Sequence, residues 1–67
     1  MKLSVRNQLP GTVNEVKLGA VMAEVVVQVG ENQIIAAITK DAAEDLALRA
    51  RDKVTVLVKS TSVMIQK

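Results

Sequence analysis

Hydrophobic and polar residues alternate along most of this chain, and a period of two residues is the pattern of β-strands. The first such segment, residues 2–8, puts Ser4 and Arg6 on the same face, so a hydroxyl and a guanidinium project in one direction. The Pro10-Gly11 pair predicts a turn or a bulge, and residues 12–16 then resume an extended pattern. The chain is therefore predicted to open with two short strands.

The middle of the chain predicts two further strands. Residues 17–20 are typical of a tight connection, because Gly19 is free to adopt a positive φ. Residues 22–29 carry alanine and valine on one face, which predicts a long strand, and residues 30–32 supply a hairpin loop. Residues 34–39 are apolar on both faces, so either a helix or another subunit has to cover this strand.

One helix is predicted after these strands. Asp41 is a candidate N-cap with Glu44 three residues later, and the helix is expected to run to about Arg49. Residues 53–59 alternate again and predict a strand, and residues 62–65 are extended and would make a short sixth strand. The predicted order is β-β-β-β-α-β.

This order predicts a mainly β fold, a small barrel of the oligonucleotide/oligosaccharide-binding (OB) type with five or six strands and one short helix. Closure into a barrel removes exposed strand edges, which a small sheet otherwise leaves open. A two-layer α+β domain is the alternative. Residues 1–67 contain no linker, low-complexity tract or internal repeat, so we expect a single domain.

The composition indicates that this domain associates with copies of itself. Of the 67 residues, 49% are hydrophobic, and none is aromatic, Cys or His. A chain of this size buries only roughly 60% of the surface that its unfolded form exposes. Disulfides, a structural metal or oligomerisation usually supplement such a core. Without Cys and His, oligomerisation is the supplement that the sequence predicts.

The charge argues against nucleic acid as a partner, and the length of the apolar stretches argues against a membrane. Nine Lys and Arg residues against seven Asp and Glu residues give a net charge of +2, and the basic positions are scattered. This charge is small for binding a nucleic acid, and no aromatic residue is present to stack on a base. No stretch approaches the roughly 20 apolar residues that span a bilayer, and no secretion signal is recognised. We therefore expect a cytoplasmic protein that binds neither nucleic acid nor membrane.

Catalysis is not expected of this chain. It contains no His, Cys or Tyr to act as acid, base or nucleophile near neutral pH. The carboxylates are dispersed, and the three glycines stand apart at positions 11, 19 and 30, so no phosphate-binding glycine loop is formed. We predict a binding protein with no catalytic cofactor and no direct protein ligands to a metal cation.

Two polar segments near the ends of the chain favour a different ligand. Residues 4–8 and 59–65 together hold one guanidinium, one ammonium and several hydroxyls, with no carboxylate in either segment. Donors without a negative charge suit a small oxyanion. Chemistry alone leaves an alternative open: Arg6 as a solvated strand residue, Lys59 as a guard against edge pairing, and residues 60–62 as an ordinary turn.

Four segments in unbroken order carry a resemblance to a known family. Residues 4–8, Ser-Val-Arg-Asn-Gln, are similar to the opening Ser-Ala-Arg-Asn-Gln of the molbindins, or Mop proteins, which are small molybdate-binding proteins. Residues 59–65 resemble their closing Lys-Ser/Ala-Thr-x-Val-Met-Ile segment. Residues 9–13 lie where that family has Leu-x-Gly-x-Val, and residues 19–25 resemble its Gly-x-x-x-Ala-Glu-Val. The resemblance extends over all 67 residues.

The resemblance implies an assembly and a ligand. Molbindins are barrels that pair by exchanging a strand and assemble as a trimer of dimers, a hexamer. They bind molybdate or tungstate reversibly at sites between subunits, which implies a role in oxyanion storage or molybdenum homeostasis. Two other classes stay open as alternatives: an OB-like nucleic-acid-binding barrel, and a purely structural oligomerisation domain.

The resemblance also implies which residues bind. One class of site, at a dimer interface, would use the opening and closing motifs and a hydroxyl ahead of the helix. Relatives often have a Ser three residues after that hydroxyl; this chain has Ala there, so its backbone N–H would have to serve. A second class, on a threefold axis, would use backbone N–H groups of the loop Gly19-Ala20-Val21. The residues implied for the dimer-interface site are Ser4, Arg6, Thr39, Ala42, Lys59 and Ser60.

Overall fold

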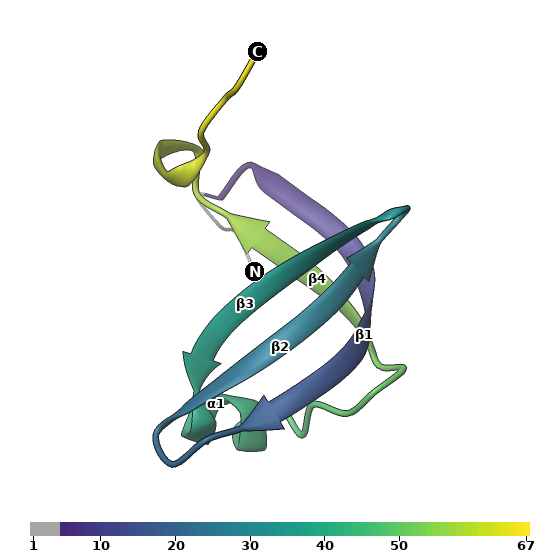
Figure 1. Cartoon of the computed structure of the whole chain (residues 1–67), viewed down its shortest axis with the longest axis vertical. Coiled ribbons are helices and arrows are strands. Elements are labelled where there is room, and N and C mark those ends of the chain that lie inside the picture. The colour runs from purple at the N-terminus through teal and green to yellow at the C-terminus, as the bar shows by residue number, and fades with distance from the viewer. Residues whose placement is uncertain (1–4) are drawn as a thin grey trace.

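One antiparallel sheet, strongly curved around a valine-rich interior, makes up most of this protein (Figure 1). The structure is a computed structural model that describes residues 5–67. The strand order in the sheet is β3-β2-β1-β4. The elements are β1 (Asn7–Leu18), β2 (Met22–Val29), β3 (Asn32–Thr39), α1 (Lys40–Asp45), β4 (Lys53–Val58) and the 3₁₀ turn η1 (Ser60–Ser62).

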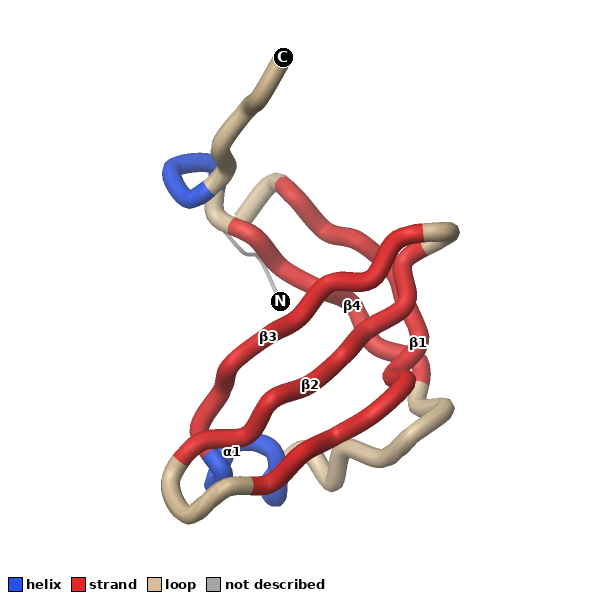
Figure 2. Tube along the Cα trace, viewed as in Figure 1, coloured by secondary structure: helices blue, strands red, loops and turns tan. Residues whose placement is uncertain are grey.

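The mainly β, OB-like fold with one short helix is confirmed, but the number of strands differs. The described residues form a sheet of four strands rather than five or six. The curled sheet brings its edge strands β3 and β4 to face each other across the interior without pairing, and α1 lies at one end (Figures 1 and 2). A single chain is therefore a barrel that stays open between β3 and β4.

The turn or bulge predicted at Pro10-Gly11 does not form there, because β1 runs through this pair and its bulge lies further on, at Asn14. The first half of β1 pairs with β4, from Asn7↔Val58 to Thr12↔Lys53, and the second half pairs with β2. At Pro10 the strand has a neighbour on one side only, so the missing N–H of proline can face the unpaired side. One long strand thus replaces the two short ones.

Gly11 is required by close packing and not by a turn. A Cβ atom at this position would lie 2.7 Å from the backbone oxygen of Gln28 and 2.7 Å from Cγ1 of Val27. These atoms belong to β2, whose pairing with β1 begins at the next residue, with Thr12↔Gln28. A bulge follows at Asn14, where the register shifts between Val13↔Val27 and Glu15↔Val26. The glycine and the bulge together let β1 bend around the interior.

The core confirms the alternation predicted for residues 22–29. Ala23, Val25 and Val27 of β2 point inward and are buried, together with Val13 of β1 and Ala43 of α1. Half-buried residues of β3 and β4 pack against these valines. Because the buried side chains are small, the core of one chain is thin, and much apolar surface stays exposed.

The helix begins two residues earlier and ends sooner than predicted. Thr39, not Asp41, is the N-cap, and its Oγ1 accepts a hydrogen bond from the Ala42 N–H at 3.1 Å. At the other end Ala47 has a φ of +51°. Hydrogen bonds from Ala47 N–H to Glu44 O and from Leu48 N–H to Ala43 O complete a Schellman motif. Glycine is the usual residue at this left-handed position and marks the end of a helix in a sequence. Because Ala47 is there instead, the sequence did not indicate where the helix ends.

The sixth strand predicted over 62–65 does not form within the described chain. Residues 60–62 form the turn η1, and residues 63–67 pair with no strand of the described chain. This tail projects away from the barrel (Figure 1). Val63 is about half-exposed, and Met64 and Ile65 are more than nine-tenths exposed.

Candidate functional site

The fold brings the opening and closing motifs side by side. The ladder between β1 and β4 ends at the pair Asn7↔Val58, so Arg6 and Lys59 are the next residue on each strand. The Nδ2 of Asn7 also donates a hydrogen bond to the backbone oxygen of Val58 at 3.0 Å. Segments more than 50 residues apart in sequence therefore meet at one end of the barrel.

The two cations at this end of the sheet face solvent. Arg6 and Lys59 are both exposed, whereas their neighbours Asn7 and Val58 are half-buried. Residues opposite each other in an antiparallel ladder lie on the same face of the sheet, and like charges so placed destabilise each other. Among residues 5–67 the ion pair formed is Lys40–Glu44, and neither Arg6 nor Lys59 has a carboxylate partner. An anion between them would relieve this repulsion.

Hydroxyl groups follow Lys59 directly. The turn η1 starts at Ser60 and is closed by a hydrogen bond from the Ser62 N–H to the Lys59 carbonyl at 2.9 Å. Ser60 is exposed, and the N-cap residue Lys59 makes no side-chain capping bond to the turn. Ser60 is therefore available to a ligand next to Lys59. Ser4, the remaining predicted residue of these two motifs, lies outside the described residues.

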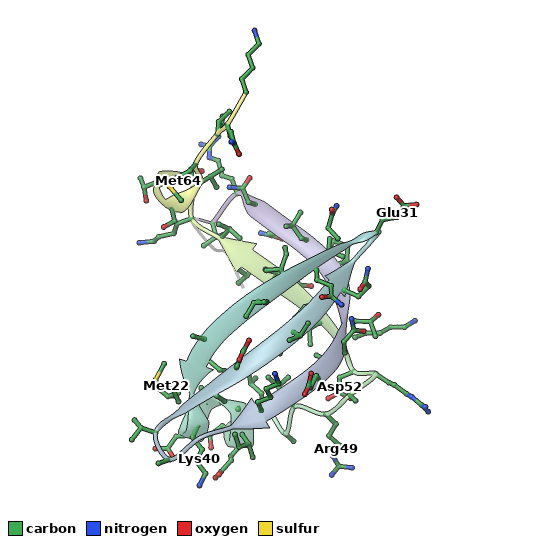
Figure 3. The ribbon with its side chains drawn as sticks, viewed as in Figure 1. Met22, Glu31, Lys40, Arg49, Asp52 and Met64 are labelled. Carbon is green, nitrogen blue, oxygen red and sulfur yellow. The ribbon has the colours of Figure 1, made fainter. Side chains whose placement is uncertain are left out.

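Thr39 and Ala42 lie at the opposite end of the barrel. Thr39 pairs with Met22, at the end of β2 where β1 finishes, whereas Arg6 precedes the start of β1. Figure 3 shows the same separation, with Met22 and Lys40 far from Met64 of the closing segment. One chain consequently brings Arg6, Lys59 and Ser60 together but does not bring Thr39 and Ala42 to them.

The cap of α1 changes what Thr39 and Ala42 can offer an anion. The Ala42 N–H is the expected donor, but it already donates to Thr39 Oγ1. The Lys40 N–H donates to the Val21 carbonyl at 2.7 Å. Because the Thr39 oxygen accepts a hydrogen bond, its own hydroxyl hydrogen is the group that can point to a ligand. Thr39 is exposed, so such a ligand can reach it.

The loop Gly19-Ala20-Val21 connects β1 and β2 and is exposed. The Gly19 N–H donates to the Met22 carbonyl at 2.8 Å, which closes a tight turn. The turn covers residues 19–21 and not 17–20, because β1 extends to Leu18, and Gly19 does not adopt the positive φ expected of it. The Val21 carbonyl accepts from Lys40, so the loop is fixed to the start of α1. In the described chain the N–H groups of Ala20 and Val21 make no such bond, which leaves them as possible donors from this loop.

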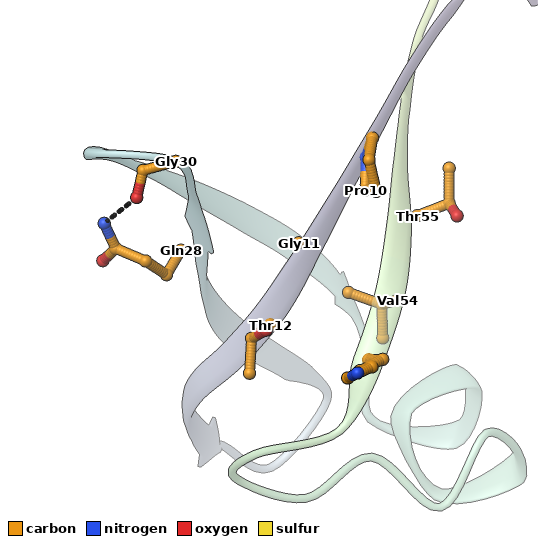
Figure 4. Close-up of a pocket in the computed structure, with 8 residues that line it drawn as sticks. Pro10, Gly11, Thr12, Gln28, Gly30, Val54 and Thr55 are labelled. Atoms are coloured by element: carbon orange, nitrogen blue, oxygen red, sulfur yellow. Dashed lines mark hydrogen bonds between the residues drawn. The ribbon is translucent and has the colours of Figure 1, made fainter.

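A hollow of the described chain lies elsewhere, around Gly11 of β1 (Figure 4). It has a volume of about 630 Å³ and is lined by Gly11, Thr12, Gln28, Lys53 and Thr55 among others. The Gln28 amide is engaged with the Gly30 carbonyl at 2.9 Å. Lys53 is its one cation, and a single cation does not balance a dianion. This hollow was not predicted, and it adds no residue to the oxyanion set.

Two features are absent from residues 5–67. No group of three or more His, Cys, Asp or Glu side chains that could hold a metal ion is found in this part of the chain. In the same residues no helix is long and apolar enough to cross a membrane.

Comparison with known proteins defines the class of protein. The family model of the TOBE domain matches residues 3–65, and the chain belongs to this family. The chain is 46% identical to molybdenum-pterin-binding protein 2 of Clostridium pasteurianum over 66 residues, which cover 97% of each protein.

Solved structures agree with this assignment. A molybdate-binding protein from Sporomusa ovata superposes with a TM-score of 0.97 at 46% identity, covering 100% of both chains. MopII from C. pasteurianum superposes with a TM-score of 0.91 at 43% identity, covering 98% of this chain and 100% of that one. The resemblance to the molbindins is thereby confirmed.

Proposed function

We propose that this protein binds molybdate or tungstate as a free oxyanion, reversibly and without chemical change. The observation that carries the proposal is the meeting of Arg6 and Lys59 at one end of the β1–β4 ladder, without a carboxylate. The names of the similar proteins, molybdate-binding and molybdenum-pterin-binding, support the same ligand. The family assignment supports a binding role and not an enzymatic one.

The charges and donors suit a tetrahedral dianion. Such an ion loses favourable hydration on binding, so it needs positive charge and several donors aimed at its oxygens. Arg6 and Lys59 together carry two positive charges, which match the charge of the anion. The hydroxyl of Ser60 would add a donor beside them, and Ser4 of the opening motif is proposed as a further donor. Each charge-assisted hydrogen bond contributes roughly 1.5–3 kcal/mol.

We favour the bare oxyanion over a pterin-bound form of molybdenum. A pterin is a flat heterocycle, and proteins usually hold such rings by stacking them on aromatic side chains. The chain contains no aromatic residue. Hydroxyl, amide, guanidinium and ammonium groups match oxyanion oxygens instead.

The proposed site is shared between subunits. Thr39 and Ala42 lie at the far end of the barrel from Arg6, so a site that uses both groups needs a second copy of the chain. In such a site Thr39 would donate through its hydroxyl, since Ala42 N–H is bonded to it. The loop Gly19-Ala20-Val21 would supply backbone donors to a second class of site on a threefold axis.

Unpaired strand edges and an apolar tail support exchange of a strand between copies. The cleft between β3 and β4 has a volume of about 310 Å³ and is lined by side chains such as Val25, Ile38 and Leu48. The tail with Met64 and Ile65 is apolar and has no partner strand among residues 5–67. A partner's tail in this cleft would cover both. We propose a hexamer built as a trimer of dimers, acting in storage or homeostasis of the oxyanion with no catalytic cofactor.

Isothermal titration of the anion-free protein tests this function. Sodium molybdate, tungstate and sulfate are titrated separately, and native mass spectrometry gives the mass of the oligomer in the same buffer. We expect heat from molybdate and tungstate, none from sulfate, and a sixfold mass. An oligomer that forms normally but gives no heat and no anion adduct would leave a purely structural domain as the function.

A further inference from the structure

Two side-chain amides fix the backbone of the opening motif. Asn7 is half-buried, and its Nδ2 donates to the Val58 carbonyl on the neighbouring strand at 3.0 Å. The next residue, Gln8, is exposed and donates from Nε2 to the Val5 carbonyl at 3.2 Å, just before β1. The first bond joins the two motifs to each other, and the second holds the opening motif to itself.

The Asn7 side-chain hydrogen bond lies at the end of the β1–β4 ladder, where it can keep the two strands together. Asn7↔Val58 is the last pair of the β1–β4 ladder, and ladder ends open more easily than their centres. The Asn7 amide adds a side-chain hydrogen bond across this last pair. Arg6 and Lys59 follow immediately, so their separation depends on whether the end of the ladder stays closed.

We propose that Asn7 is a positioning residue for the oxyanion site, acting through Arg6 and Lys59. Side chains alternate between the two faces of a strand, so half-buried Asn7 points to the opposite face from exposed Arg6. Asn7 therefore holds the two cations at one distance without touching the anion. This role rests on the proposed function, because it has meaning only where these cations bind a ligand.

The physical basis is preorganisation of a repelling pair. Without an anion, Arg6 and Lys59 favour an open ladder end, and closing it on binding costs part of the binding energy. The Asn7 bond keeps the end closed before the anion arrives. Loss of one such hydrogen bond is expected to weaken molybdate binding about three- to tenfold.

A double-mutant cycle tests the role. Sodium molybdate is titrated calorimetrically into the oligomeric wild type, Asn7→Ala, Arg6→Ala and the double variant, well below their melting temperatures. Asn14→Ala is the matched control, since Asn14 lies on the same strand and donates a side-chain bond to Gln28 Oε1, also at 3.0 Å. We expect Asn7→Ala to weaken binding as above and Asn14→Ala to leave it within about twofold, because its lost bond lies far from the cations.

The double variant separates positioning from a general structural effect. If Asn7 acts through Arg6, adding Asn7→Ala to Arg6→Ala causes little further loss, whereas equal losses in both backgrounds would overturn the role. Unchanged affinity in Asn7→Ala, with Arg6→Ala weakened, would overturn this inference and leave the oxyanion site intact. Unchanged affinity in Arg6→Ala would overturn the site itself. Asn7→Thr, which suits a strand but lacks the amide, replaces Asn7→Ala if that variant does not fold.

Discussion

Replacing Gly11 by alanine should destabilise the protein because β2 leaves no room for a side chain. The added Cβ would lie 2.7 Å from Gln28 O, 2.7 Å from Val27 Cγ1 and 3.0 Å from Val29 Cγ2. The first of these atoms is backbone, so the strands themselves must separate. Overpacking of this kind costs about 1–3 kcal/mol. For a domain of this size, each kcal/mol lowers the melting temperature by about 4–8 °C.

The sign of the effect is the decisive result. No positive φ is found at Gly11, so by conformational entropy alone Gly11→Ala would stabilise the protein by about 0.4–1 kcal/mol. Thermal unfolding followed by circular dichroism, at one fixed protomer concentration, measures the difference. A melting temperature equal to or above that of the wild type would refute the steric account of Gly11.

Gly30 provides the contrast to Gly11. It has a φ of +59° in the two-residue loop between β2 and β3, and nothing lies within 4 Å of an added Cβ. Gly30→Ala should therefore cost about 1–2 kcal/mol through backbone strain alone. Gly11→Ser should therefore destabilise the protein more than Gly11→Ala does. Gly30→Ser should have nearly the same stability as Gly30→Ala, because nothing lies near the added side chain.

Three further predictions concern the helix and the tail. Ala47→Gly should raise stability by about 1 kcal/mol, because glycine tolerates the φ of +51° at this position; in thermal unfolding the control Ala50→Gly should not stabilise. Thr39→Val should lower the free energy of unfolding by about 1 kcal/mol, because it removes the oxygen that accepts a hydrogen bond from Ala42 N–H. Thr39→Ser keeps a hydroxyl and should retain most of this stability. Equal losses of stability in both variants would contradict the role of Thr39 as the cap. Replacing Met64 and Ile65 by Ser should dissociate the oligomer at higher protein concentration in analytical ultracentrifugation, and an unchanged profile would exclude the tail from the interface.

The parts of the fold that the sequence predicted are those where a local pattern and the tertiary structure agree. In β2 the alternating residues Ala23, Val25 and Val27 are buried as the period of two requires. The hairpin at Gly30 was predicted from the glycine, and its positive φ explains why that signal was reliable.

The errors have physical causes that no local pattern contains. Pro10-Gly11 has the composition of a turn, yet the glycine is needed for contact with Val27 and Gln28 of β2, which lie more than 15 residues further on. The end of α1 was misplaced because Ala47 adopts the left-handed conformation without the usual glycine. The tail was expected to be extended and to form a strand, but a strand needs a neighbour, and residues 5–58 supply none for it.

For the candidate site, the sequence predicted the kind of ligand but not how the strands align its residues. The residue types of the two end motifs indicated an oxyanion, whereas the pairing of Asn7 with Val58, which aligns Arg6 with Lys59, needed the structure. The proposed positioning role of Asn7 was missed because the sequence does not show which group its amide bonds. That role can be inferred only once Val58 is known to lie opposite Asn7.

The openness of the single chain and the incompleteness of its site have a common explanation under the proposed function. A barrel with unpaired β3 and β4 edges and a thin core gains stability from a partner. The same partner would bring Thr39 of one copy toward Arg6 of another, which one chain keeps at opposite ends of β1. Binding of the anion would then stabilise the assembly, since a ligand that bridges copies binds the assembled form and not the separate chains. Assembly and oxyanion binding are, on this account, a single coupled equilibrium.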